Sequence, residues 1–207
     1  MPYPAALSRV RQQEAGRLYQ SGLSAQQIAD KLGVNLNATF YALRKQNIKR
    51  RSAKETNRLR FEAKPLSYQT KTRLTREEES LKQAAVMLYW AEGYKVSKST
   101  IDFANSDPKM ALIFMRFLTG ICRVDKTRIR GHLYCYEGQD VAALTEYWSN
   151  LLSLPRGQFI KPYIKQAAPG PRGPRMLHGL VHIVYCDKKL LLQLLTWIDE
   201  YAQGLTK

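Results

Sequence analysis

A strongly basic stretch without a hydrophobic pattern lies between two parts of the chain that have one. Residues 44–76 contain 12 Lys or Arg and 2 acidic residues, with mostly polar residues between them. Such a segment cannot bury a core of its own, although residues 53–61 have a helical pattern. We therefore expect two domains, at residues 1–50 and 77–207, joined by a basic linker at residues 51–76.

The charge of the chain is unevenly distributed. Its formal net charge is +16; residues 1–76 contain 16 Lys or Arg against 4 acidic residues, and residues 77–207 contain 17 against 13. A basic half joined to a nearly balanced half indicates a polyanionic partner, most simply double-stranded DNA. The linker then serves either as an arm that contacts phosphates, beginning at Lys49, Arg50 and Arg51, or as a solvated spacer.

Several classes of protein are disfavoured by the sequence. No run approaches the roughly 18 apolar residues of a membrane span, and the first ten residues lack an apolar signal core. These features predict a cytoplasmic protein with no membrane contact, and the expected DNA partner makes it nucleoid-associated. Because no glycine-rich phosphate loop or nucleophile elbow is present, no small-molecule cofactor is expected.

The cysteines indicate neither a disulfide framework nor a zinc ribbon, because there are three and none forms a CxxC pair. His178, His182 and Cys186 recur at intervals of four, which on a helix would suit a metal ion. The β-branched residues around His182 predict a strand instead, where this spacing separates potential ligands by about 13 Å. We therefore disfavour a zinc site at this position.

Residues 9–46 are expected to form three short helices. The segments 9–22, 24–33 and 34–46 have helical apolar spacing, and Ser24 with Gln27 forms a capping box for the second. Gly33 supplies the positive φ of a tight turn between helices. The outer face of the third helix then carries the candidate DNA-binding side chains Asn35, Asn37, Tyr41 and Arg44.

The phrase GLSAQQIADKLGVN, at residues 22–35, resembles the resolvase-type helix-turn-helix of recombinases and bacterial regulators. The resemblance covers about a fifth of the chain and implies a recognition helix that enters the major groove. Asn can read adenine and Arg can read guanine through paired hydrogen bonds, so the exposed side chains suit base contacts. The alternative is a helical hairpin that binds a protein.

Residues 77–207 alternate between helical and strand patterns. Thr75 and Glu78 form a second capping box, and the apolar helix that follows ends at Glu92 and Gly93. A strand at residues 98–107 precedes an amphipathic helix capped by Asp107, with Pro108 at its first position. A second half-buried strand, at residues 126–136, exposes on one face Lys126, Arg128, Arg130, His132, Tyr134 and Tyr136.

The remaining elements are a helix, two strands and a final helix. In the strand at residues 158–166, Lys161, Tyr163 and Lys165 alternate with isoleucines, and Pro162 places it at a sheet edge or at a bulge. The fold class is therefore α+β, with a basic and aromatic face on the sheet. Such a face is the composition expected of a sheet that lies on DNA.

The segment AVMLYWAEG, at residues 85–93, resembles a divergent LAGLIDADG motif, and FANSDP is similar to the segment that follows it in homing endonucleases. The resemblance implies an antiparallel sheet that reads the major groove, motif helices that pack side by side, and Glu92 as the ligand of Mg²⁺ at the scissile phosphate. One motif in the chain implies a homodimer through the helix at residues 80–91.

The resemblance implies a Mg²⁺-dependent homing-type DNA endonuclease that hydrolyses phosphodiester bonds, with Glu92 as its catalytic acid. It also leaves a non-catalytic interpretation open, because a carboxylate at a helix end can simply be solvated. The rival is a DNA-binding transcription regulator that retains the same domain and uses the sheet only for binding.

Overall fold

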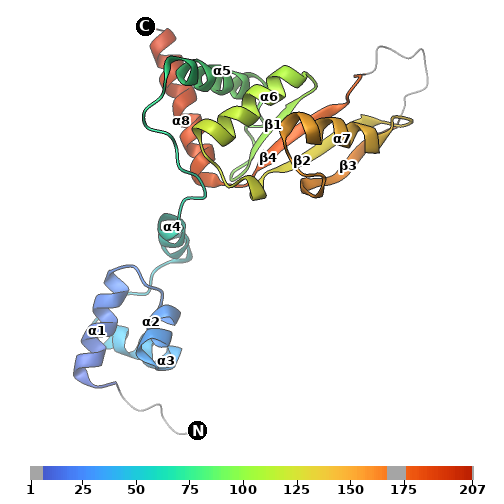
Figure 1. The fold of residues 1–207 in the computed structure, drawn as a ribbon. Helices are drawn as coiled ribbons and strands as arrows, with labels where there is room; N and C mark the ends of the chain where they lie inside the picture. Colours follow the sequence, from blue (N-terminus) through green and yellow to red (C-terminus); the bar gives the residue numbers. More distant parts are fainter. Residues whose placement is uncertain (1–6, 167–175, 207) are drawn as a thin grey trace. The chain divides into compact units, whose positions relative to one another are not determined.

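The computed structural model describes residues 7–166 and 176–206, and it divides into two compact units, Met1–Pro65 and Leu66–Lys207. The described residues form eight α-helices and a four-stranded sheet, which makes the fold mixed α+β (Figure 1). The boundary between the units lies inside the stretch that the sequence indicates as a linker. None of the described helices is both long enough and apolar enough to cross a membrane.

The first unit contains three short helices around a small core. They are α1 (Arg9–Gln20), α2 (Ala25–Leu32) and α3 (Leu36–Lys45). The predicted capping box is confirmed, since Ser24 Oγ accepts from the backbone N–H of Gln27 and the Gln27 side chain accepts from that of Ser24. Gly33 has the predicted positive φ, 62°, and ends α2.

Small residues let these helices approach one another. Ala15 of α1, Ala29 of α2 and Ala42 of α3 are fully buried, and Ile28 and Leu43 fill the space between them. An alanine leaves room for a neighbouring backbone that a longer side chain would exclude.

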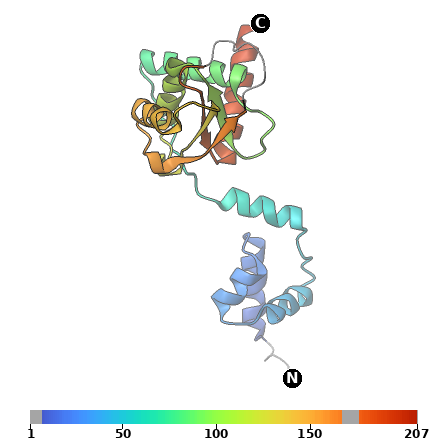
Figure 2. The ribbon, with the colours of Figure 1, turned by 90° about the vertical axis from the view of Figure 1, so that its right-hand side faces the viewer.

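A fourth helix, α4 (Ala53–Ala63), follows in the same unit and is seen along its length in Figure 2. It begins with a capping box of Ser52 and Glu55, and it has no buried residue. A helix without a buried face relies on its cap and its attachments rather than on a core. Arg51, directly before this cap, attaches the start of α4 to the end of α1.

The second unit alternates helices and strands. Its α-helices and strands are α5 (Arg76–Glu92), β1 (Ile101–Asn105), α6 (Pro108–Arg116), β2 (Arg130–Tyr136), α7 (Val141–Leu152), β3 (Phe159–Lys165), β4 (Leu180–Tyr185) and α8 (Lys188–Leu205). The cap predicted at Asp107 is confirmed, because its side chain accepts from the backbone N–H groups of Lys109 and Met110.

The sheet has the strand order β1-β4-β2-β3 and is mixed. Strand β4 pairs antiparallel with β1 and with β2, whereas β2 and β3 are parallel. The prediction of an antiparallel sheet is therefore wrong at this edge. The reason is α7, because a helix between two neighbouring strands returns the chain to the start of the sheet and makes the second strand parallel.

One face of this sheet is buried by helices, and none of the described helices buries the other. The core side chains Ile101, Phe103, Leu133, Val181 and Ile183 point to the covered face and are at most 1% exposed. Figure 1 shows α6 and α7 on the same side of the strands. The alternate residues of β1, β2 and β4 are half-buried or exposed, so this second face is available to a partner.

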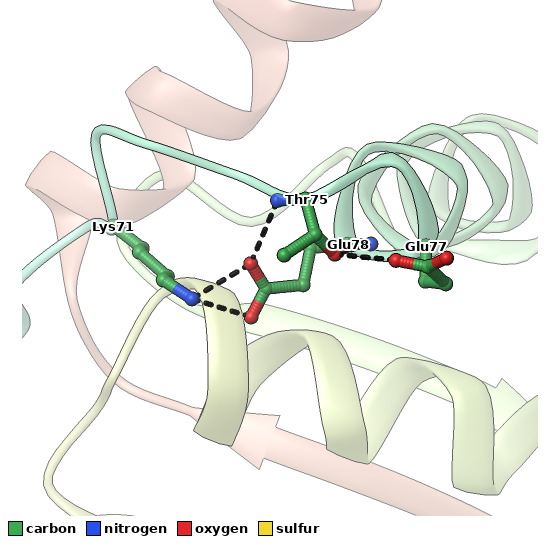
Figure 3. A network of polar contacts seen from close by, with 4 residues as sticks. All are labelled: Lys71, Thr75, Glu77 and Glu78. Atoms are coloured by element: carbon green, nitrogen blue, oxygen red, sulfur yellow. Dashed lines mark hydrogen bonds and ion pairs between the residues drawn. The ribbon is translucent and has the colours of Figure 1, made fainter.

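The segment before α5 is hydrogen-bonded to the second unit. The backbone N–H of Gln69 donates to Cys122 O and that of Lys71 to Ile121 O, at 3.0 and 2.8 Å. Lys71 Nζ also contacts both carboxylate oxygens of Glu78, at 2.6 and 2.7 Å, beside the capping box of Thr75 (Figure 3). These residues fall within the stretch interpreted as linker, yet hydrogen bonds fix them to residues 121 and 122 and to the start of α5.

Candidate nucleic-acid interface

The first unit presents one polar stripe on α3. Asn37, Tyr41 and Arg44 follow one another at intervals of four and three, so they share a helix face, and all are exposed. Tyr41 is 45% exposed, and the ammonium of Lys45 lies over its ring, 5.8 Å from the centroid. These side chains offer an amide, a phenol and a guanidinium to whatever lies against the helix.

Asn35 has a different role from its neighbours. It is the N-cap of α3, and its Oδ1 accepts from the backbone N–H of Ala38 at 2.7 Å. Paired contact with adenine needs both the oxygen and the nitrogen of an asparagine amide. Asn37 therefore meets that requirement better than Asn35, although both side chains are exposed.

The chain after α3 adds cations beside this stripe. An open groove of about 820 Å³ is lined by Asn37, Phe40, Leu43, Arg44, Asn47, Ile48, Lys49 and Arg50. The Arg50 guanidinium lies over the Phe40 ring, 4.1 Å from its centroid. The structure thus brings together four of the residues predicted to bind DNA, namely Asn37, Arg44, Lys49 and Arg50.

Arg51 is engaged within the unit. Its Nη1 donates to Gly22 O and Leu23 O, at 3.2 and 3.1 Å, and its Nη2 donates to Tyr19 O. Its guanidinium also lies over the Tyr19 ring, 3.9 Å from the centroid. Arg51 therefore anchors the start of α4 to the end of α1, and its guanidinium has fewer donors left for a phosphate than that of Arg50.

On the second unit, the uncovered face of the sheet is basic and aromatic. Arg130, His132, Tyr134 and Tyr136 alternate along β2 with the core residues of the other face, as the sequence predicts. Tyr163 and Lys165 of β3 stand in register with Tyr134 and Tyr136. The rings of Tyr134 and Tyr163 are 5.0 Å apart.

Three of the predicted residues depart from that face. Lys126 and Arg128 lie in a short 3-10 helix before β2, not in the strand, and Arg128 donates to Cys186 O and lies over the Tyr185 ring. Asp125 starts this turn by accepting from the backbone N–H of Thr127. Lys161 is displaced by a bulge at Pro162, because two residues of β3 there stand opposite one residue of β2.

The structure adds two residues to this face that were not among those predicted to bind DNA, Asp102 of β1 and His182 of β4. Asp102 Oδ1 and His182 Nδ1 are 2.8 Å apart, and His132 stands directly opposite His182 in the register of β2 and β4. In the sequence each residue alternates with apolar neighbours of its own strand, and this alternation predicts an outward-facing position for both. Their proximity depends on the pairing of β4 between β1 and β2, which no local pattern indicates.

Burial lowers the pKa of His132, and the neighbouring His182 lowers it further. Asp102 and a backbone hydrogen bond with Lys161 act in the opposite direction. His132 is thus neutral over a wider pH range than an unperturbed imidazole. It contributes a neutral ring, not a cation, to the uncovered face at neutral pH.

Glu92 is the last residue of α5 and is exposed. Gly93 follows it and bridges to Phe103 of β1, so Glu92 stands where the helix meets the edge of the sheet. A Cβ at Gly93 would come within 2.5 Å of Tyr89, which requires glycine here. The ammonium of Lys95 donates to Trp90 O and Gly93 O, at 2.7 and 3.0 Å, and offsets the negative end of the helix dipole.

The carboxylate of Glu92 is a suitable oxygen ligand for Mg²⁺, but one carboxylate does not complete the coordination shell of the ion. No hydrogen bond or ion pair engages it within the described residues, which also contain no group of three or more His, Cys, Asp or Glu side chains suited to a metal. Mg²⁺ commonly takes one or two carboxylates and completes its shell with water and phosphate oxygens. Within the described residues Glu92 alone does not make a Mg²⁺ site; a phosphate and a second carboxylate would have to complete one.

The comparisons with known proteins add no relative, since no protein-family model, curated protein or solved structure matches the chain.

Proposed function

We propose that this protein binds duplex DNA sequence-specifically, through α3 of a helix-turn-helix and through the uncovered sheet face of a LAGLIDADG-like domain. The observation that carries the proposal is the basic groove beside α3, where Asn37 and Arg44 lie with Lys49 and Arg50. Amide and guanidinium groups can read base edges, while neighbouring cations hold phosphates. The centre of a protein–protein interface is usually apolar and contains few charged residues, so the several cations of this groove suit DNA better than a protein.

The second unit supports the same partner independently. Its uncovered face combines Arg130 and Lys165 with the tyrosines of β2 and β3, and Asp102 is the one acidic residue in the four described strands. The Oδ1 atom of that acid lies 2.8 Å from His182 Nδ1 on the same face. A two-unit protein of this kind would contact one duplex at two places.

We further propose that the protein is a Mg²⁺-dependent homing-type endonuclease. Glu92 would hold the ion, and the ion would supply a nucleophilic water and neutralise charge at the scissile phosphate. Neighbouring residues of this chain hold the end of α5 in place and leave the Glu92 carboxylate without an intramolecular partner among the described residues. Gly93 and Tyr89 fix the end of α5 against β1, and Lys95 satisfies the terminal carbonyls, so that the Glu92 carboxylate itself is left for a ligand.

A homodimer through residues 80–91 would supply the second carboxylate. The stripe of α5 that faces away from the core carries Ala84, Met87, Trp90 and Ala91, and Trp90 is 41% exposed. Apolar residues along one uncovered helix face suit a second copy of the same helix, and the alanines permit close approach. Both Glu92 side chains would then lie at the same end of the helix pair.

The second candidate function is a non-catalytic transcription regulator. It is favoured by the solitary position of Glu92, since no other described carboxylate completes a metal site within the chain. The two proposals share the DNA interface and differ in whether the bound duplex is cut.

Selection of duplexes from a random pool by the full-length protein tests the shared part of the proposal. An enriched motif is expected, and Arg44→Ala should weaken binding to it by about 1 to 3 kcal/mol, with a much smaller loss on random DNA. Lys31→Ala, an exposed cation of α2 outside the groove, is the matched control and should change neither affinity. Absence of an enriched motif, or equal losses on both DNAs for Arg44→Ala, would contradict sequence-specific reading by α3.

A further inference from the structure

A cluster of four rings occupies the centre of the uncovered sheet face. The ring of Tyr134 lies 4.3 Å from that of His182, 4.6 Å from that of His132 and 5.0 Å from that of Tyr163, measured between centroids. The two imidazoles are 5.8 Å apart. The four rings come from the neighbouring strands β2, β3 and β4, and their contacts fix the position of the His182 ring. A side chain that recognises one base needs a fixed position of this kind.

Asp102 fixes which nitrogen of His182 faces outward. Its Oδ1 is 2.8 Å from His182 Nδ1, and the two side chains are 23% and 16% exposed. An ionised carboxylate only accepts hydrogen bonds, so Nδ1 carries the proton of the neutral ring. The other nitrogen, Nε2, is then an acceptor when the ring is neutral and becomes a donor when the ring is protonated.

The Nε2 atom of His182 is accessible. No described side-chain nitrogen or oxygen is both buried and without a hydrogen-bond partner, and no partner of this atom is present in the described part of the chain. The atom therefore reaches solvent on the face that also presents the aromatic and cationic side chains of β2 and β3. A ligand on that face can exchange a hydrogen bond with it.

The uncovered face carries charged and titratable side chains from each of the other three strands. They are Asp102 of β1, Arg130, His132, Tyr134 and Tyr136 of β2, and Tyr163 and Lys165 of β3.

We propose that His182 is a specificity-determining residue that reads one base of the DNA, and that its preference follows its protonation state. When neutral, Nε2 accepts from the exocyclic amino group of adenine or cytosine. When protonated, it donates to N7 or O6 of guanine. This inference rests on the proposed function, because it assigns a base contact to the sheet face of a DNA-binding protein.

Selection of duplexes from a random pool at pH 8.0 and at pH 5.5 tests the inference with the full-length protein. One position of the enriched motif should change from adenine or cytosine to guanine as the pH falls, by about fivefold in relative affinity. His182→Gln should remove this change and leave the rest of the motif intact. His178→Gln is the matched control, since His178 stacks on Tyr147 of α7, with centroids 3.8 Å apart, and should leave the change in place.

A second measurement does not depend on DNA. Nitrogen NMR of the ¹⁵N-labelled imidazoles should show neutral His182 with its proton on Nδ1, and Asp102→Ala should shift the proton toward Nε2. Unfolding curves of each variant establish that it is folded before its DNA preference is compared with that of the native protein.

The outcomes separate this inference from the function on which it rests. An enriched motif that is the same at both pH values, or a pH effect that survives in His182→Gln, would overturn the reading by His182 and leave DNA binding intact. A proton on Nε2 of His182 in the native protein would also overturn it. Failure to enrich any motif would remove both the inference and the proposed function.

Discussion

Neighbouring arginines in the first unit have different surroundings, and the sequence alone does not separate them. Arg50 and Arg51 follow one another in a basic run, and both suit phosphate contact by composition. In the structure Arg50 lies in the open groove, whereas Arg51 donates to three main-chain carbonyls. The difference arises because the Arg51 guanidinium lies against the carbonyls that follow the end of α1, whereas that of Arg50 lies over the Phe40 ring.

Arg51→Ala is therefore expected to lower the stability of the first unit by about 2 kcal/mol, since it removes charge-assisted hydrogen bonds to partly buried carbonyls. Arg51→Lys should restore little of this, because one ammonium cannot reproduce the planar fork of donors. Urea unfolding followed by far-UV circular dichroism measures the change. The fluorescence of Trp90, Trp148 and Trp197 reports separately on the second unit, which holds all three tryptophans.

Arg50→Ala is the matched control and should cost less than about 1 kcal/mol of stability, since it removes only an exposed interaction with the Phe40 ring. Its main effect should be on DNA affinity. Equal destabilisation by the Arg50 and Arg51 substitutions would show that the anchoring role of Arg51 is wrong.

At the scale of helices and strands, the sequence predicts those features that depend only on residues close together in the chain. The capping boxes of Ser24 and Thr75, the cap at Asp107 and the bulge at Pro162 depend on residues a few positions apart, and the structure confirms each of them. The pairing of β2 with β3 depends instead on the path of α7. The histidine pair of β2 and β4 likewise depends on strand order, which joins residues 50 positions apart.

The start of α5 has a polar network whose contribution to stability depends on pH. The hydrogen bonds from Lys71 and from the backbone of Thr75 hold the pKa of Glu78 below its ordinary value (Figure 3). A carboxyl whose folded pKa is depressed stabilises the fold above its unfolded pKa, near 4.5, and loses that contribution as the pH falls through the lower folded value.

Glu78→Gln should therefore destabilise the second unit at pH 7, and the difference from the native protein should shrink between pH 5 and pH 3. Glutamine keeps an acceptor for the backbone N–H of Thr75, so the change isolates the charge. Thermal unfolding of both proteins across this range measures the effect. A difference in stability that stays constant with pH would show that the ion pair with Lys71 contributes nothing.

At the scale of the whole molecule, the excess of positive charge should appear in the salt dependence of DNA binding. Replacing both Lys49 and Arg50 by glutamine removes two positive charges. The slope of log K against log salt concentration should then fall by about 0.9 for each phosphate that the protein no longer neutralises. The matched control neutralises Arg9 and Lys31, which are exposed on α1 and α2 and lie outside the groove. An unchanged slope for the first pair, or equal changes for both pairs, would remove these residues from the phosphate interface.

The assignment of Glu92 combines the residue, the helix that ends with it and the proposed dimer. It rests on an exposed carboxylate without a partner among the described residues, placed at the junction of α5 and β1. A nuclease and a regulator would share the charge of the chain, the helices of the first unit and the sheet face of the second. Cleavage of the protein's own bound DNA is therefore the decisive property.

The most direct test incubates the selected duplex with Mg²⁺ and the native protein, Glu92→Gln or the matched control Glu137→Gln, an exposed acid of the second unit. The native protein and the control should cut both strands, whereas Glu92→Gln should bind the duplex with nearly unchanged affinity in Ca²⁺ and leave it intact. Tight binding by the native protein without cleavage in Mg²⁺ or Mn²⁺ would contradict the endonuclease and leave the regulator; cleavage by Glu92→Gln would contradict the role of Glu92.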